Sequence, residues 1–255
     1  MTARALETRA VSKRFGALTA VQDVNFRLEA GARHALIGPN GAGKTTFINL
    51  LTGVLAPSQG QVLLNGDDIT AVSEADRVKR GIARTFQINR LFRGLSVLEN
   101  VYIAVAERMG AAPIMIKPAG SRSDVIEESM RLLELLNLQD DAQHRISELP
   151  YGRQRLVEIA IALGLNPKVL LLDEPAAGVP SSESHMILDV IDQLDPDIAV
   201  LIIEHDMDVV FRFAKKITVL VAGAVLTEGT PQQIASDERV RAVYLGQDTQ
   251  HGIAS

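Results

Sequence analysis

At 255 residues, with 47% hydrophobic and 22% charged residues, the chain can bury a full core and has the composition of an ordinary globular protein. Its net charge of −5 argues against a nucleic-acid partner, and the absence of cysteine excludes disulfides and thiolate metal sites. No secretory signal is visible, and the longest apolar runs fall far below the ~18 residues of a membrane span, so we expect a protein that is soluble by itself.

The first predicted elements are strands. Residues 6–11 and 24–28 alternate apolar and polar side chains, as half-buried strands do. Residues 35–37 form a short apolar run, and residues 61–64 read as a strand that enters a tight turn at Asn65-Gly66.

A phosphate-binding loop is predicted at residues 38–45. Its spacing, Gly-x-x-x-x-Gly-Lys-Thr, follows the apolar run and opens into a predicted helix at 46–51. Glycines in this context let backbone N–H groups turn inward on an anion, and the start of the helix adds its positive dipole end. Lys44 is expected to reach the β- and γ-phosphates of a nucleoside triphosphate, and the Thr45 hydroxyl to hold Mg²⁺. The predicted nucleotide-binding residues here are Gly38, Asn40, Gly41, Gly43, Lys44, Thr45 and Thr46.

The middle of the chain is predicted to be helical. Helices are expected at residues 97–108, 124–138 and 154–165, with a loop between glycine and proline breakers at 109–121. One face of the second predicted helix carries four apolar residues that we assign to the core: Ile126, Met130, Leu133 and Leu136.

A second motif follows about 130 residues after the phosphate-binding loop. The apolar run 169–172 ends in the adjacent acids Asp173 and Glu174, which fits the second half of a P-loop ATPase site. Asp173 would help to hold Mg²⁺, directly or through water. Glu174 would polarise the attacking water as a general base.

The predicted fold class is α/β. Continuous apolar runs such as 169–172 and 199–203 suit strands buried on both faces of a largely parallel sheet, and helical segments lie between them. We expect an ATP-binding α/β core made of residues 1–86 and 167–255, with a helical subdomain at 87–166 inserted into it. Residues 231–246 are expected to add two short helices.

Residues 149–155, Leu-Pro-Tyr-Gly-Arg-Gln-Arg, resemble the signature motif of ATP-binding cassette (ABC) ATPases, placed shortly before the second motif as in that family. The resemblance covers about residues 5–246. It implies the ABC-ATPase fold of P-loop NTPases, with a mixed sheet core and an inserted α-helical subdomain.

The resemblance also implies roles for residues that would not be chosen singly. Phe15 matches the aromatic that stacks on adenine, although alone it reads as a core residue. Gln87 matches the Q-loop glutamine, which contacts Mg²⁺ or water, and His205 matches the switch histidine at the γ-phosphate. Tyr151 and Gly152 of the signature would face nucleotide. The implied catalytic set is Glu174, His205 and Gln87, and the implied metal ligands are Thr45, Gln87 and Asp173.

Four positions depart from the family pattern, and one of them is Tyr151, which stands where the signature usually has glycine. Pro150 stands where the signature usually has serine, and it supplies neither a hydroxyl nor a backbone N–H to a phosphate. Arg153 replaces a glutamine, and Pro180 stands where the loop after the second motif usually has Asp or Asn. These changes put communication across a dimer in doubt.

Within the family, Tyr151-Gly152, the run 173–178 and the ending 228–246 resemble cassettes of branched-chain and hydrophobic amino-acid importers. This likeness implies ATP and Mg²⁺ as cofactors and transmembrane permease subunits whose coupling helix engages a groove near residues 87–108. It also implies a second cassette in a homo- or heterodimer, a substrate-binding protein as an indirect partner, and a peripheral location on the cytoplasmic face of the inner or plasma membrane.

Other readings stay open. Cassettes of lipopolysaccharide-type exporters and of urea or aromatic-acid importers share much of the pattern. A soluble ABC ATPase of translation or DNA repair would usually carry two cassettes, coiled coils or zinc-binding cysteines. P-loop kinases and GTPases lack the signature motif, and a regulatory module with weak turnover would explain Pro150 and Pro180.

Overall fold

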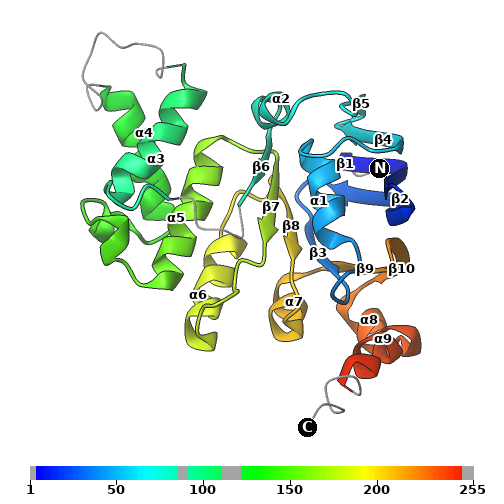
Figure 1. The fold of residues 1–255 in the computed structure, drawn as a ribbon. Coiled ribbons are helices and arrows are strands. Elements are labelled where there is room, and N and C mark those ends of the chain that lie inside the picture. The colour runs from blue at the N-terminus through cyan, green and yellow to red at the C-terminus, as the bar shows by residue number, and fades with distance from the viewer. Residues whose placement is uncertain (1–3, 86–90, 111–121, 249–255) are drawn as a thin grey trace. The chain divides into compact units, whose positions relative to one another are not determined.

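Figure 1 shows the computed structural model, which describes residues 4–85, 91–110 and 122–248. Backbone contacts divide the chain into two units. The first unit comprises Met1–Glu74 and Ala199–Ser255, and the second comprises Ala75–Ile198. The two units meet at 74/75 and 198/199. The α/β core and the helical subdomain were expected to meet at 86/87 and 166/167, and that division stays a prediction.

The first unit contains a four-stranded antiparallel sheet. Its strands are β1 (Arg4–Phe15), β2 (Leu18–Glu29), β4 (Gln59–Leu64) and β5 (Asp67–Asp68), in the order β2-β1-β4-β5. The strands predicted at 6–11, 24–28 and 61–64 lie inside β1, β2 and β4, so these predictions are confirmed. Asn65 and Gly66 both have positive φ, as a tight turn of this sequence requires.

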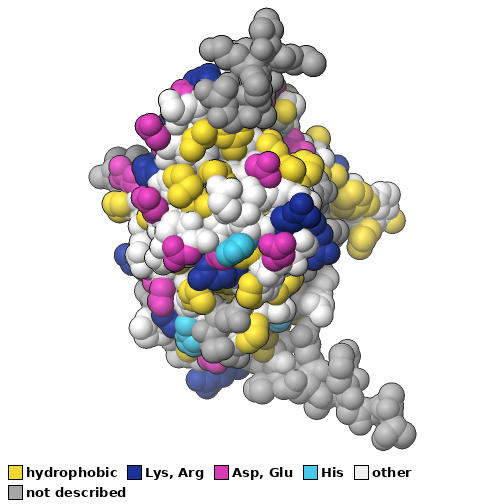
Figure 2. Space-filling model, turned by 90° about the vertical axis from the view of Figure 1, so that its left-hand side faces the viewer, with side chains coloured by type: hydrophobic (Ala, Val, Ile, Leu, Met, Phe, Trp, Pro, Cys, Tyr) yellow, Lys and Arg dark blue, Asp and Glu magenta, His cyan; other side chains and the backbone are white. Residues whose placement is uncertain are grey.

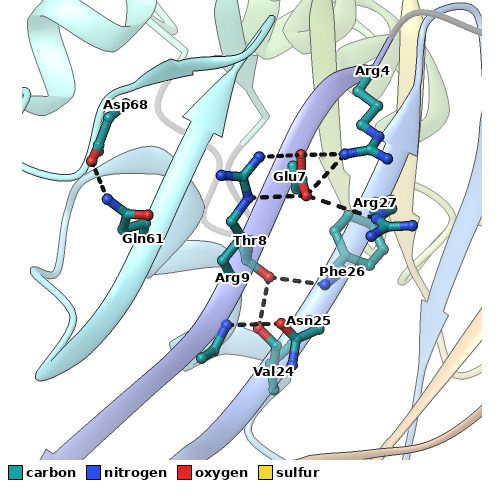
Figure 3. A network of polar contacts seen from close by, with 11 residues as sticks. Arg4, Glu7, Thr8, Arg9, Val24, Asn25, Phe26, Arg27, Gln61 and Asp68 are labelled. Atoms are coloured by element: carbon teal, nitrogen blue, oxygen red, sulfur yellow. Dashed lines mark hydrogen bonds and ion pairs between the residues drawn. The ribbon is translucent and has the colours of Figure 1, made fainter.

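Polar side chains also link β1 to β2. Figure 3 shows Arg4, Arg9 and Arg27 around the carboxylate of Glu7, at N–O distances of 3.0, 3.2 and 3.8 Å. The hydrogen bond from Arg9, followed by that from Arg4, lowers the pKa of Glu7. The carboxylate is 7% exposed, so these cations supply the counter-charge that its burial demands.

The first unit also holds parallel strands. β3 (Arg33–Ile37) lies between β8 (Ala199–Ile203) and β9 (Lys216–Val221) and runs parallel to both, while β10 (Ala224–Gly229) is antiparallel to β9. Every residue of β3 and β8 is buried, which explains the apolar runs 35–37 and 199–203. The helices of this unit are α1 (Lys44–Thr52), α7 (Met207–Phe213), α8 (Pro231–Ser236) and α9 (Glu238–Asp248). The last two confirm the helices predicted at 231–246.

The second unit pairs β6 (Ile82–Arg84) with β7 (Val169–Asp173) in parallel. Helices α3 (Val97–Arg108), α4 (Ser123–Leu135) and α5 (Tyr151–Gly164) pack on one another (Figure 1). Among the described residues, no helix is long and apolar enough to cross a membrane. The helical elements are α2 (Glu74–Lys79), α3 (Val97–Arg108), α4 (Ser123–Leu135), the short 3₁₀ turns η1 (Gln139–Asp141) and η2 (Ile146–Glu148), α5 (Tyr151–Gly164) and α6 (Ser181–Asp192).

Two helix predictions need correction. The helix expected at 124–138 ends at Leu135, because Asn137 adopts a left-handed φ of 55°. Ile126 and Met130 are only half-buried, since the buried face is set one position away. That face consists of Val125, Ser129, Leu132, Leu133 and Leu136. The third helix begins at Tyr151, three residues before the expected start.

A series of polar contacts crosses β3, β9 and β10, from the buried His34 and Thr218 to the partly exposed Glu228. The His34 imidazole lies 2.8 Å from the Thr218 hydroxyl, which donates to Glu228 at 2.8 Å. Burial lowers the pKa of His34 to about 4, with a smaller opposing effect of Glu228 and a smaller lowering effect of Lys216. The native state therefore keeps His34 neutral at a pH where the unfolded chain binds a proton.

The lowered pKa of His34 predicts that the protein becomes less stable in acid. The contribution of His34 to the free energy of unfolding is complete above about pH 6.5 and is lost as the pH falls toward 4, by about 3 kcal/mol. Urea unfolding of the wild type and of His34→Gln, which cannot titrate, measures the difference. We expect the two free energies to converge as the pH falls from 6.5 to 4; parallel curves would contradict the assignment.

Candidate nucleotide-binding site

The predicted phosphate-binding loop joins the buried strand β3 to helix α1. Gly43 is the N-cap of α1, with a left-handed φ of 97° and no side-chain cap. The first turn of α1 carries no acidic residue. Because the first N–H groups of a helix lack intrahelical acceptors, this end of α1 suits an anion.

Lys44 lies across this loop. Its Nζ donates to the carbonyl oxygens of Gly38 at 2.5 Å and Pro39 at 3.1 Å. The side chain is half-buried, and Thr45 beside it is exposed. The remaining residues predicted for this loop lie with it: Gly38 is buried, Asn40 and Gly41 are exposed, and Gly43 and Thr46 are half-buried.

We expect Gly43→Ala to destabilise the protein by about 1–3 kcal/mol. A Cβ at this position would lie 2.4 Å from the Ala20 carbonyl oxygen, in a backbone conformation that alanine rarely adopts. Gly41→Ala is the matched control, since Gly41 also has a positive φ but no atom lies within 4 Å of its built Cβ. Chemical denaturation compares the two, and equal losses would refute the steric argument.

Two further candidates lie at or just after the ends of strands in the first unit. Phe15 ends β1 and is 47% exposed, with Lys13 Nζ 5.3 Å from its ring centroid, so it is not a core aromatic. His205 follows β8 and its side chain is 63% exposed, with Nδ1 3.9 Å from Glu204 Oε2. Glu204 is only 1% exposed. Sequence reasoning missed Glu204, although an acid directly after an apolar strand was the signal used for Asp173.

The acidic pair of the second unit, Asp173 and Glu174, lies at the end of β7. Asp173 is its last residue and is 7% exposed. Glu174 is half-buried and has a φ of 47°, a strained value for a non-glycine residue and one often seen at functional sites. Sequence reasoning also missed Arg84, whose Nη2 lies 2.6 Å from Asp173 Oδ2. Gln87 lies outside the described residues.

The signature residues begin α5. Pro150 is the N-cap and provides no side-chain cap, Tyr151 is the first helical residue, and Gly152 is buried. Arg155 Nη2 donates to the Tyr151 hydroxyl at 2.8 Å, and its guanidinium lies 5.1 Å from the ring centroid. Arg153 instead pairs with Asp141, on the 3₁₀ turn η1.

The donor chemistry fits Mg²⁺. Thr45 offers a hydroxyl oxygen and Asp173 a carboxylate, and hard oxygen ligands of this kind are what Mg²⁺ prefers. The residues with described placement contain no cluster of three or more His, Asp or Glu side chains that could hold a metal alone.

Comparisons with known proteins identify the family. A family model described as "ABC transporter" matches residues 21–177, and one described as "Branched-chain amino acid ATP-binding cassette transporter" matches residues 224–249. The chain is 38% identical to the high-affinity branched-chain amino acid transport ATP-binding protein BraF of Pseudomonas aeruginosa, and 36% identical to LivG of Escherichia coli K12. Both alignments cover 95% of this chain and 98% of the relative.

A solved structure agrees in fold. The ADP conformation of MJ1267, an ATP-binding cassette of an ABC transporter, superposes with a TM-score of 0.85 at 32% identity. The match covers 96% of this chain and 100% of that one. The fold is therefore the α/β ABC-ATPase fold predicted above. The chain belongs to the ABC transporter family, as its ATP-hydrolysing cassette subunit.

Proposed function

We propose that this chain energises the import of branched-chain or related hydrophobic amino acids. The observation that carries the proposal is the match at residues 224–249 to the model of branched-chain amino acid cassettes. The relatives BraF and LivG, similar over almost their whole length, support it.

In the proposed site, ATP is held by the loop before α1. The Lys44 amine would exchange its two carbonyl acceptors for β- and γ-phosphate oxygens, and the start of α1 would face the same anion. The exposed ring of Phe15 would stack on adenine. Thr45, Asp173 and Gln87 would hold Mg²⁺, which when bound neutralises charge on the phosphates.

Hydrolysis would depend on Glu174. Its carboxylate would accept a proton from the attacking water, while His205 and Gln87 orient that water and the γ-phosphate. The imidazole of His205 is 63% exposed, beside the buried Glu204, so a ligand could reach it. Most of the rate enhancement would come from positioning and charge stabilisation.

A second cassette, identical or related, would complete the active unit. Tyr151 and Gly152 would face the nucleotide held by that partner, at the start of the 14-residue helix α5. Pro150 weakens this contact because it brings no hydroxyl. For this reason we favour a heterodimer, in which the related cassette supplies the stronger signature.

We expect Pro150→Ser to raise turnover of the assembled complex by about tenfold, the worth of one hydrogen bond of roughly 1–1.5 kcal/mol. A serine at this N-cap could cap α5 or reach the γ-phosphate. Pro150→Ala is the control, since it removes the ring without adding a hydroxyl. Steady-state ATPase assays measure the turnover of both variants. Equal turnover of Pro150→Ser and Pro150→Ala would mean that the missing hydroxyl has no effect.

A permease subunit would dock on the second unit. A groove is lined there by Ala75 and Val78 of α2, Glu107 and Arg108 of α3, and Lys79 and Leu165. The predicted coupling region, 87–108, therefore contributes part of its wall. Figure 2 shows hydrophobic side chains exposed between charged ones on one face of the molecule. The exposed hydrophobic residues of the second unit include Phe92, Ile103 and Met109. Such mixed surfaces suit a partner helix, and docking would place the cassette at the cytoplasmic membrane face.

The experiment that tests this function is purification of the protein from a gently solubilised membrane fraction, followed by identification of its partners. We expect multi-span proteins together with a second cassette, and then a substrate-binding protein that associates with the complex. Recovery from the soluble fraction alone would favour a soluble ABC ATPase. Components of a lipopolysaccharide-type exporter would support the exporter alternative.

A further inference from the structure

Arg84 forms a buried ion pair with Asp173. Its Nη2 lies 2.6 Å from Oδ2, and the two side chains are only 11% and 8% exposed. Arg84 ends β6 and Asp173 ends β7, and the strands pair with Arg84 opposite Leu171. The register of the two paired strands therefore brings the two side chains within reach of each other.

Backbone groups beside the ion pair are held independently of it. The Thr85 N–H donates to the Leu171 carbonyl at 3.0 Å, and the Asp173 N–H donates to the Thr85 hydroxyl at 3.4 Å. Neither bond involves the guanidinium. Both bonds can therefore persist if Arg84 leaves the carboxylate.

The electrostatics make Arg84 and a metal ion alternatives. A carboxylate removed from water needs a counter-charge, and a guanidinium stays protonated at any pH at which proteins fold. Mg²⁺ on Asp173 would supply that counter-charge and would repel a cation beside it. The contact to Arg84 occupies Oδ2, so full coordination of Asp173 by a metal would be opposed as long as Arg84 stays.

We propose that Arg84 competes with Mg²⁺ for Asp173 and thereby sets the Mg²⁺ concentration at which this cassette binds its nucleotide. The inference rests on the proposed role of Asp173 as a metal ligand. Arg84 holds the carboxylate in place and neutralised before metal binding, and it gives up Oδ2 when Mg²⁺ and nucleotide bind. It is a positioning residue, because it acts through Asp173.

The test is calorimetric titration of ADP binding to the full chain at a series of Mg²⁺ concentrations. Arg84→Met keeps an unbranched apolar stem and removes the charge. We expect its half-saturating Mg²⁺ concentration to fall by about tenfold, the effect of removing one charge-assisted competitor. We also expect a lower unfolding temperature in EDTA, and a larger rise than in the wild type when Mg²⁺ and ADP are added.

Two further variants keep the test decisive. Arg84→Lys retains a cation and is expected to stay within about threefold of the wild type. Arg84→Gln is a second neutral variant, which can still donate a hydrogen bond to Asp173 and serves if Arg84→Met does not fold. An unchanged or raised half-saturating Mg²⁺ concentration in a folded neutral variant overturns the proposal.

Asp173→Asn separates this inference from the proposed function. If Asp173→Asn leaves the Mg²⁺ dependence of ADP binding unchanged, Asp173 is not a ligand, and both the proposed metal site and the competition are wrong. If Asp173→Asn weakens that dependence and the neutral Arg84 variants leave it unmoved, the metal site stands and the competition alone fails.

Discussion

Glu174→Gln is expected to lower ATP turnover of the assembled transporter by about 10²–10⁴-fold and to leave ATP binding intact. Glutamine has nearly the shape of glutamate, so it can occupy the same half-buried position and left-handed backbone after β7. It cannot accept a proton from water at neutral pH. The change therefore removes the base and little else. Phosphate release measures turnover, and an equilibrium titration with ATP shows whether the variant still binds the nucleotide.

Glu127→Gln is the matched control for this experiment. Glu127 is an exposed carboxylate on α4 of the same unit, and the same substitution there should leave turnover at the wild-type value. If Glu174→Gln also turns over at that rate, the proton acceptor is another group and the proposed role of Glu174 is wrong.

Lys44→Ala is expected to weaken ATP binding by about 1.5–3 kcal/mol for each charge-assisted bond to a phosphate that the amine makes. The amine is already held at the loop, by the carbonyls of Gly38 and Pro39, so little reordering is needed to reach a ligand there. Binding of a fluorescent ATP analogue gives the change in affinity, and turnover at subsaturating ATP should fall with it.

Lys215→Ala is the control for Lys44→Ala, since Lys215 is an exposed lysine in the same unit and belongs to none of the proposed site. Its affinity for the analogue should equal that of the wild type. Near-normal ATP binding and turnover in Lys44→Ala would contradict the assignment of Lys44 to the phosphates.

Local features of the fold could be predicted from the sequence because neighbouring residues encode them. The loop before α1 depends on Gly43 and on the helix that follows it, and both lie within a few residues. The burial of β8 on both faces corresponds to an apolar run over the whole strand, and that of β3 to the shorter run 35–37. The C-terminal end of α4 was harder to predict from the sequence, because the helix ends through the left-handed conformation of Asn137.

Features that depend on distant residues could not be predicted. Arg84 and Asp173 are 89 residues apart along the chain, and they come into contact because β6 pairs with β7. In α4, the periodic pattern alone favoured Ile126 and Met130, whereas the packing of α3 and α5 buries Val125 and Ser129. A serine on the buried face carries no apolar signal; its hydroxyl is satisfied by the Val125 carbonyl at 2.7 Å. Periodicity finds the helix, but the neighbouring helices decide which face is buried.

The most direct measurement of the central claim is ATP-dependent uptake of labelled leucine into proteoliposomes that contain the purified complex and its binding protein. We expect uptake that requires this chain, stops with Glu174→Gln, and is competed by isoleucine and valine. Uptake of urea or an aromatic acid in place of leucine would correct the substrate. ATP hydrolysis with no uptake of any of these solutes would contradict the importer account.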